Sequence, residues 1–458
     1  MSSRDLTVGP VRGHLIRLGA PMTLGIVAAM SVSLVDTYFL GLLGTAELAA
    51  ISFTFPVVFA ITSLSIGLGA GTASVVSREI GRGDLERVKR TATDSLVLAV
   101  IIVAVVAGIG WLTAEPLFRL LGADPEVLVL TVAYMKIWYF GMPFLVVPMV
   151  ANNIIRANGD AIVPSAIMIA VSVINAGLDP LLIFGLWGLP AMGIEGAAWA
   201  SVIARAVTMV VALGVVVFRE KLVDLAVPAW GVLMASWRRI LAVGIPAALG
   251  NAVNPVGIAV VTGIVATFGT EAVAGFGVAT RVEAFASIPM LALSAAIGPI
   301  AGQNWGSGHR DRVLSAVRQS FVFCLAWSVG AAVLLFLLAE PIAGVFSSDE
   351  AVVGEATRYL AIVPISLAGY GIVTIAAGAY NALGKPLTGL AYYLVRTLIL
   401  YVPLAWIASL FAPTWAVFAA IAVSNVVAGA TVGWHALRWL GEAGLEDCTP
   451  NAAPAPAE

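Results

Sequence analysis

Residues 19–44, GAPMTLGIVAAMSVSLVDTYFLGLLG, form an apolar stretch that is long enough to cross a membrane. The stretch contains one acidic residue, Asp36, well inside it. A carboxylate in hydrocarbon is costly, so an acid at this depth indicates a functional site. A related stretch begins at residue 244 with GIP, and it carries Val261 where the first copy carries Asp36. The two copies therefore share a structural element and differ in the residue that could carry chemistry.

The composition is that of an integral membrane protein. Of the 458 residues, 60% are hydrophobic and 11% are charged, whereas soluble globular chains carry about 25% charged residues. Apolar runs long enough for transmembrane helices recur about a dozen times. The net charge of −2 gives no signal for nucleic acid, and the sequence has no basic domain to bind it, so we expect no nucleic-acid partner. The lipid bilayer is the expected environment.

An internal repeat organises these runs. A shift of 225 residues places GRG at 81–83 on GSG at 306–308, and it places Gly159 on Gly384. Each half contains six apolar spans, and an even number gives both halves the same orientation. Such a parallel repeat has a pseudo-two-fold axis along the membrane normal and a cavity between its halves. The predicted fold is therefore an all-α integral membrane protein with twelve transmembrane helices in two six-helix lobes.

The spans and connections define five segments. They are a cytoplasmic N-terminal segment (1–13), a first lobe with spans 1–6 (14–218), a cytoplasmic linker (219–236), a second lobe with spans 7–12 (237–440) and a disordered cytoplasmic tail (441–458). Basic residues gather in the even-numbered connections, as in Arg87, Lys89 and Arg90 after span 2. The positive-inside rule then places both termini in the cytoplasm of a multi-pass protein of the cell (inner or plasma) membrane.

A second acid, Asp179, is expected in the same lobe as Asp36 and at a similar depth. Asn175 lies four residues before Asp179 and shares its helix face, and Pro180 frees a backbone carbonyl because it lacks an N–H. These oxygens suit a Na⁺ ion or a bound proton. The alternatives are that Asp179 ends a helix in water and that Asp36 is a structural partner of a nearby Asn or Tyr.

Further polar residues could face the same interior of the first lobe. Tyr134, Asn152 and Asn153 on span 4 and Ser201 on span 6 are the candidates; interhelical hydrogen bonding is the alternative role for each of them. Pro21 permits a bend in span 1. The bend could change during transport, or it could be a fixed feature of the helix.

The second half offers a different set of charged residues within its spans. Arg281, Glu283 and Arg396 are candidates for lining a cavity there. No metalloprotease, nucleotide-binding or hydrolase motif occurs in the sequence. We therefore expect neither an enzyme nor a protein with an organic cofactor, and only H⁺ or Na⁺ as a coupling ion.

Four motifs carry a resemblance to a known family: LVDTYFLGLLG (34–44), NNIIRANGD (152–160), NAGLDPLLIFG (175–185) and GAAWAS (196–201). Over about residues 12–440 the chain resembles the multidrug and toxic compound extrusion (MATE) transporters, and in detail their DinF-like branch. The resemblance implies a secondary active multidrug antiporter that exports organic, often cationic, compounds in exchange for H⁺ or Na⁺ by alternating access.

The resemblance also implies roles for individual residues. Asp36 resembles the essential acid of span 1 in the family, and Asp179 its partner on span 5. The other matched positions are Asn175, Tyr134, Asn152, the span-1 proline Pro21, and Ser201, which stands where the motif often has Thr. The stretch TLILYVPLAWIA (397–408) lacks the acid that the NorM-like branch uses, so coupling is expected in the first lobe.

Other functions fit the same architecture. A flippase for lipid-linked saccharides shares the broad shape of this architecture. A channel or an intramembrane enzyme is an alternative from a different class of function. We expect a monomer that binds small drugs or toxic organic compounds. The sequence leaves the substrate open, and Asp36, Asn175, Asp179 and Ser201 suit H⁺ and Na⁺ equally.

Overall fold

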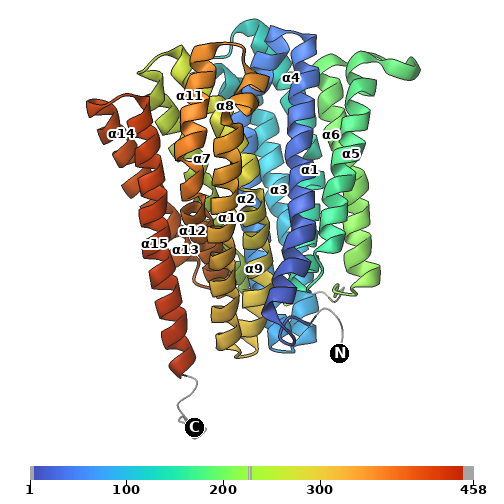
Figure 1. The fold of residues 1–458 in the computed structure, drawn as a ribbon. Coiled ribbons are helices and arrows are strands. Elements are labelled where there is room, and N and C mark those ends of the chain that lie inside the picture. Colours follow the sequence, from blue (N-terminus) through green and yellow to red (C-terminus); the bar gives the residue numbers. More distant parts are fainter. Residues whose placement is uncertain (1–4, 225, 227–228, 447–458) are drawn as a thin grey trace, which may run out of the picture.

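The computed structural model describes residues 5–224, 226 and 229–446, which form long helices joined by short turns (Figure 1). Helices are the expected outcome, because hydrocarbon offers no water to bond exposed backbone groups and a helix satisfies them within one segment. Both described ends of the chain lie at the bottom of Figure 1, on the side that we call the terminus face.

The first lobe contains six helices. They are α1 (Val11–Leu43), α2 (Thr45–Gly81), α3 (Leu85–Leu120), α4 (Pro125–Ala157), α5 (Ile162–Phe184) and α6 (Gly193–Gly214). A π-helical turn, Val215–Arg219, extends α6.

The second lobe contains the remaining helices. They are α7 (Trp230–Ala266), α8 (Thr270–Ala286), α9 (Ile288–Gly306), α10 (Arg310–Phe346), α11 (Glu350–Ile362), α12 (Leu367–Ala382), α13 (Pro386–Leu394), α14 (Val402–Phe411) and α15 (Thr414–Glu446). Short breaks divide three of the spans: Ser287 separates α8 from α9, a 3₁₀ turn, Pro364–Ser366, joins α11 to α12, and a π-helical segment, Val395–Tyr401, joins α13 to α14.

The number of spans agrees with the sequence. Among the described residues, eleven helical segments are long and apolar enough to cross a membrane, and α8 and α9, bent by 43° at Ser287, together make a twelfth. The prediction of an all-α membrane protein is therefore confirmed. Three predicted boundaries differ from the structure. α1 begins at Val11, α7 begins at Trp230 within the predicted linker, and α15 continues to Glu446 into the predicted tail. Residues 447–458 lie outside the described part of the chain.

The repeat is visible in the backbone of the turns. Gly83 and Gly308 both have left-handed φ angles, of 76° and 83°, and so do Gly159 and Gly384, at 86° and 78°. Each pair is separated by the 225-residue offset. A left-handed φ is open to glycine at little cost and is strained for other residues. The repeat thus explains why glycine stands at these four turns.

The two lobes meet along a seam that runs from the middle of the protein to the terminus face. It is formed by α2 of the first lobe against α7 and α9 of the second. A Cβ on Gly67 would overlap the Gly244 carbonyl, and a Cβ on Gly302 would overlap Ser77. Lipid is as apolar as these helices, so close backbone approach at small residues, and not exclusion from water, holds such helices together.

Polar bonds cross between the lobes in the same region. Ser74 Oγ donates to the Asn381 carbonyl at 2.5 Å, and Gln303 Nε2 donates to the Ala157 carbonyl at 2.7 Å. Arg239 on α7 pairs with Glu79 on α2 at 2.9 Å. We define the seam bonds as these three interactions. They close the terminus face of the protein.

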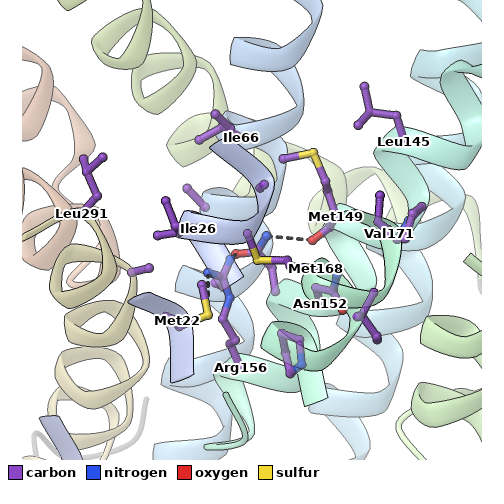
Figure 2. Close-up of a pocket in the computed structure, with 18 of the residues that line it drawn as sticks. Met22, Ile26, Ile66, Leu145, Met149, Asn152, Arg156, Met168, Val171 and Leu291 are labelled. Carbon is purple, nitrogen blue, oxygen red and sulfur yellow. Dashed lines mark hydrogen bonds between the residues drawn. The ribbon is translucent and has the colours of Figure 1, made fainter. Parts of the chain in front are cut away.

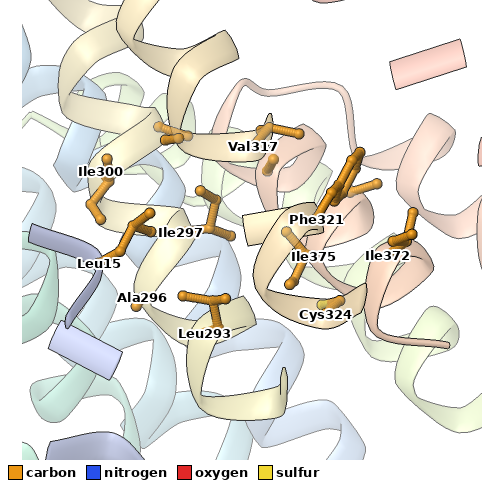
Figure 3. Close-up of a cluster of buried hydrophobic side chains, with 14 of the residues drawn as sticks. Leu15, Leu293, Ala296, Ile297, Ile300, Val317, Phe321, Cys324, Ile372 and Ile375 are labelled. Carbon is orange, nitrogen blue, oxygen red and sulfur yellow. The ribbon is translucent and has the colours of Figure 1, made fainter. Parts of the chain in front are cut away.

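A buried hydrophobic cluster supports the seam. Figure 3 shows Leu15 of α1 against Leu293, Ile297 and Ile300 of α9, with side chains of α10 and α12 beside them. The first helix of the first lobe thus packs directly on the second lobe near the terminus face.

Candidate functional site

Two carboxyl groups meet inside the first lobe. Asp36 lies near the Leu43 end of α1 and Asp179 near the Phe184 end of α5, and the amide of Asn175 lies 3.1 Å from Asp36 Oδ1 and 3.4 Å from Asp179 Oδ1. Asp179 is completely buried. Two carboxylates held this close repel each other when both are ionised, and a single positive species between them would relieve that repulsion.

Asn175 ties this pair to α6. With its amide oriented to satisfy its neighbours, the nitrogen donates to Asp36 Oδ1 at 3.1 Å and the oxygen accepts from the Ser201 backbone N–H at 3.3 Å. With the amide reversed, the nitrogen lies 3.4 Å from Asp179 Oδ1 and 3.3 Å from Ser201 Oγ. The orientation of an amide is assigned from its neighbours. In both orientations Asn175 connects the acids to Ser201.

The pair has room for one positive species. No N–H or O–H of the described residues donates to Asp179 Oδ2, which is buried. An unpartnered buried oxygen is costly, and a proton held between the carboxyl groups, or a cation bound there, would satisfy it. Na⁺ prefers oxygen ligands of the kinds that Asp36, Asp179, Asn175 and Ser201 offer. The residues therefore fit either ion.

Two further side chains surround the pair. Tyr134 on α4 and Arg205 on α6 both lie within electrostatic range of Asp36. The structure thus brings together six residues from α1, α4, α5 and α6, five of which were predicted as site residues: Asp36, Asn175, Asp179, Ser201 and Tyr134. We call this group, with Arg205, the carboxyl site.

A cavity of about 600 Å³ lies between the lobes and reaches the carboxyl site. Asp36, Asn175 and Ser201 form part of its wall, while Asp179 lies behind them. The second lobe contributes uncharged groups to the wall, among them Asn251 and Tyr393. The charged side chains among the described lining residues are Asp36, Arg156 and Arg205, all from the first lobe.

Asn152 and Asn153 also line this cavity, as predicted for polar residues of span 4. Asn152 Oδ1 has no hydrogen-bond partner among the described groups. Asn153 donates to the Met149 carbonyl at 2.8 Å and accepts from Arg156 at 2.5 Å. Pro21 lies within α1, which stays helical across it.

The three charged residues predicted for a second-lobe cavity do not come together. Arg281 is exposed and lies outside the cavity wall. Glu283 accepts a hydrogen bond from the Tyr359 hydroxyl. Arg396 is buried and donates to Asn425 and Asn254 at 2.9 and 2.8 Å. Glu283 and Arg396 interact electrostatically at longer range, and neither lines the cavity.

Comparison with known proteins identifies the family. A family model described as MatE matches residues 21–181 and 246–407, one match in each lobe. The starts of the two matches are separated by the same 225 residues as the repeat. This chain belongs to the MATE family of transporters. The expectation of a transporter and not an enzyme is thereby confirmed, and so is the resemblance at the level of the family.

Curated MATE relatives differ in what they carry. The chain is 35% identical to an FAD transporter of Shewanella oneidensis, over 94% of this chain and 96% of the relative. It is 27% identical to the probable multidrug resistance protein NorM of Thermotoga maritima, over 76% of this chain and 74% of the relative.

Solved MATE structures have the same fold. A mutant of the Vibrio cholerae MATE transporter VcmN with one Asp-to-Asn substitution superposes with a TM-score of 0.90 at 30% identity, over 94% of this chain and 96% of that chain. A multidrug resistance MATE family transporter in an outward-facing conformation superposes with a TM-score of 0.91 at 25% identity, over 97% of this chain and 99% of that chain.

Besides Arg205, two residues of this MATE protein were not predicted from its sequence. Arg156 lies in the cavity wall, and Gln303 bridges the lobes. Arg156 stands within the NNIIR motif, three residues after Asn153, with which it bonds, so the helical spacing carried a usable signal. Gln303 bonds a residue 146 positions away, and no local pattern reveals such a contact.

Proposed function

We propose that this MATE protein is an ion-coupled exporter of small organic molecules, with the coupling ion bound at the carboxyl site. The single observation that carries the proposal is the contact between Asp36 and Asp179, which leaves a place for one positive species beside the cargo cavity. Loading that species removes negative charge from the cavity wall, so it changes the attraction between wall and cargo. Coupling requires such a difference in affinity between states.

The cycle uses the seam as its gate. With the seam bonds closed on the terminus face, the cavity is accessible from the opposite side, and the match to an outward-facing MATE structure supports this assignment. A proton or Na⁺ enters, the cargo leaves, and the lobes then rock to open the terminus face. There the ion is released and new cargo binds. We place that face, with both termini, in the cytoplasm of the cell membrane, and the transporter acts as a monomer.

Multidrug export, often of organic cations, is the first candidate for the cargo. It is supported by the multidrug resistance relatives and by the mixed wall of the cavity, in which apolar side chains outnumber charged ones. We also assign the protein to the DinF-like branch of the family, because its paired acids lie in the first lobe. A flippase for lipid-linked saccharides would instead move labelled lipid between leaflets, which a lipid-translocation assay detects.

Export of FAD is the second candidate. The specific observation in its favour is the identity of 35% with an FAD transporter along almost the whole chain. Everted vesicles would accumulate FAD if it is the cargo and ethidium if a cationic drug is. Measuring the uptake of FAD and of ethidium with one vesicle preparation shows which of the two compounds is the better cargo.

The coupling proposal is tested in proteoliposomes that contain purified protein. Cargo-triggered ion flux is measured with a pH gradient alone and then with a Na⁺ gradient alone, which identifies the ion. Asp36→Asn and Asp179→Asn should abolish gradient-driven transport, while Glu126→Gln, which removes an exposed acid of the same lobe, should leave it unchanged. Parent-like transport by both Asp variants would refute the assignment.

A further inference from the structure

Arg156 is a cation in the cavity wall without an acidic partner. It is the penultimate residue of α4, near the terminus face. Its guanidinium donates to Asn153 Oδ1 at 2.5 Å and lies 4.0 Å from the Met22 thioether. Within the described part of the chain it forms no ion pair. A charge that is removed from bulk water without a counter-ion is unfavourable, so Arg156 is suited to receive an anion.

The guanidinium has donors to spare. A guanidinium carries five N–H donors in a planar fork, and the contacts to Asn153 and Met22 use two of its nitrogens from one side. Arg156 belongs to the wall of the cavity, and Figure 2 shows it at the lower end of the labelled group, beside Met22. The remaining N–H groups are therefore available to a ligand in the cavity.

An apolar wall adjoins the guanidinium. Met22 and Met168 lie near Arg156, and Met149, Ile26 and Val171 continue the wall away from it (Figure 2). Methionine side chains are flexible and polarisable, and they pack well against aromatic rings of varied shape. A ligand with an acidic group and a flat apolar body would satisfy both the guanidinium and this wall.

The cation also lies far from the carboxyl site. Met22, which contacts Arg156, precedes Asp36 by 14 residues on α1, which corresponds to about 21 Å along a helix. Arg205, the other cation of the wall, lies instead within electrostatic range of Asp36. The cavity is thus polar at two ends: the carboxyl site lies at one end, and the guanidinium of Arg156 lies at the other.

Resting on the proposed export function, we infer that Arg156 anchors the acidic group of an organic anion, a phosphate ester or a carboxylate, whose aromatic body lies on the methionine wall. Both groups can accept two parallel hydrogen bonds from one guanidinium. The cargo then occupies the end of the cavity nearest the terminus face, while the ion occupies the carboxyl site. Ion and cargo are therefore not required to share the same side chains.

Two matched ligand pairs test this inference by equilibrium binding to the purified, full-length protein. FMN and riboflavin share one ring system and differ in a phosphate, while pyrenebutyrate and pyrenebutanol differ in a carboxylate. A charge-assisted anchor should favour the anion of a pair by about 10- to 100-fold. The pair that shows the preference identifies the acidic group.

Variants assign the preference to Arg156. Arg156→Gln should bring the anion down to the affinity of its neutral partner, Arg156→Lys should retain part of the preference, and Arg119→Gln should change nothing. Arg119 serves as the matched control because it is exposed near the far end of α3 and loses the same charge. Unchanged binding of the neutral ligands by Arg156→Gln shows that this variant is folded.

The outcomes separate this inference from the coupling proposal. Equal affinities within both pairs for the parent protein, or a preference that survives in Arg156→Gln, would overturn the anchor. These measurements use no gradient, so they do not depend on Asp36. Loss of gradient-driven flux in Asp36→Asn without any anion preference would leave the coupling proposal standing alone.

Discussion

Replacing Gln303 by leucine tests whether the polar contacts of the seam set the balance between the two states of the transporter. Gln303 lies on α9 of the second lobe and is 2% exposed. Its Nε2 donates to the Ala157 carbonyl of the first lobe at 2.7 Å, and its Oε1 accepts from the Leu6 amide at 3.1 Å. Leucine has a similar volume and makes neither bond.

The expected shift follows from these two bonds. Each hydrogen bond contributes about 1 kcal/mol net, and the substitution leaves the carbonyl of Ala157 and the amide of Leu6 buried without this partner as long as the seam is closed. In the open state both groups can bond to water. The closed state should therefore lose about 2 kcal/mol, which multiplies the open-to-closed ratio by about 30.

The assay is a distance distribution between nitroxide labels on the two lobes. Glu86→Cys and His309→Cys place labels at exposed positions beside equivalent turns of the terminus face. Cys324 is buried, and Cys448→Ser removes the other native thiol. Gln319→Leu is the matched control, because Gln319 bonds Ser315 within α10 and does not bridge the lobes.

Gln303→Leu should add or enlarge a long-distance population, while the Gln319 control should reproduce the parent distribution. Identical distributions for the parent and Gln303→Leu, with both proteins folded, would refute the view that these bonds hold the terminus face closed.

Two further predictions concern the second lobe and the N-terminal segment. Arg396→Met should lower the free energy of unfolding by about 3 kcal/mol, because it removes two charged hydrogen bonds, to Asn254 and Asn425; an unchanged thermal unfolding midpoint would contradict this. The Thr7 hydroxyl and amide donate to Asp5 and hold the pKa of that carboxyl below its usual value. Their stabilisation is complete above the unfolded pKa of about 3.9 and is lost as the pH falls through the depressed folded pKa. Hydrogen exchange at Thr7 should therefore accelerate in acid beyond its intrinsic rate, and Asp5→Ala, which removes the acceptor, should exchange fast at every pH.

The large features of the fold could be predicted from the sequence because they depend on local or periodic information. Apolar runs predict the spans directly. Glycines such as Gly83 and Gly308, which are related by the 225-residue repeat, mark equivalent turns in the two lobes. The bend at Ser287 and the break at 364–366 were not predicted. Both interrupt a single apolar run, and hydrophobicity alone does not locate such a break.

The candidate site was predictable where the sequence places an ionisable residue inside an apolar span, because burying a charge in hydrocarbon is energetically unfavourable. Asp36 and Asp179 stand out in apolar stretches, and the structure places them in contact. Arg156 did not stand out, because an arginine at a helix end ordinarily extends its charge to the membrane surface. Its direction into the cavity depends on how α4 packs against α2, α3 and α6, which no single segment encodes. The same holds for Gln303, whose partners lie in the other lobe and at the N-terminus.

The proposed coupling at the carboxyl pair has a consequence for the electrical work that each turnover can use. Under the proposed coupling with one proton per cycle, the pair brings one positive charge inward in each turnover. Against an outgoing monovalent organic cation this exchange is electrically silent, and only the proton concentration difference drives it. Against an outgoing dianion such as FMN, three elementary charges move in the same electrical sense, and a potential of 100 mV would contribute about 7 kcal/mol. The charge of the cargo would then decide whether the membrane voltage alone can power export.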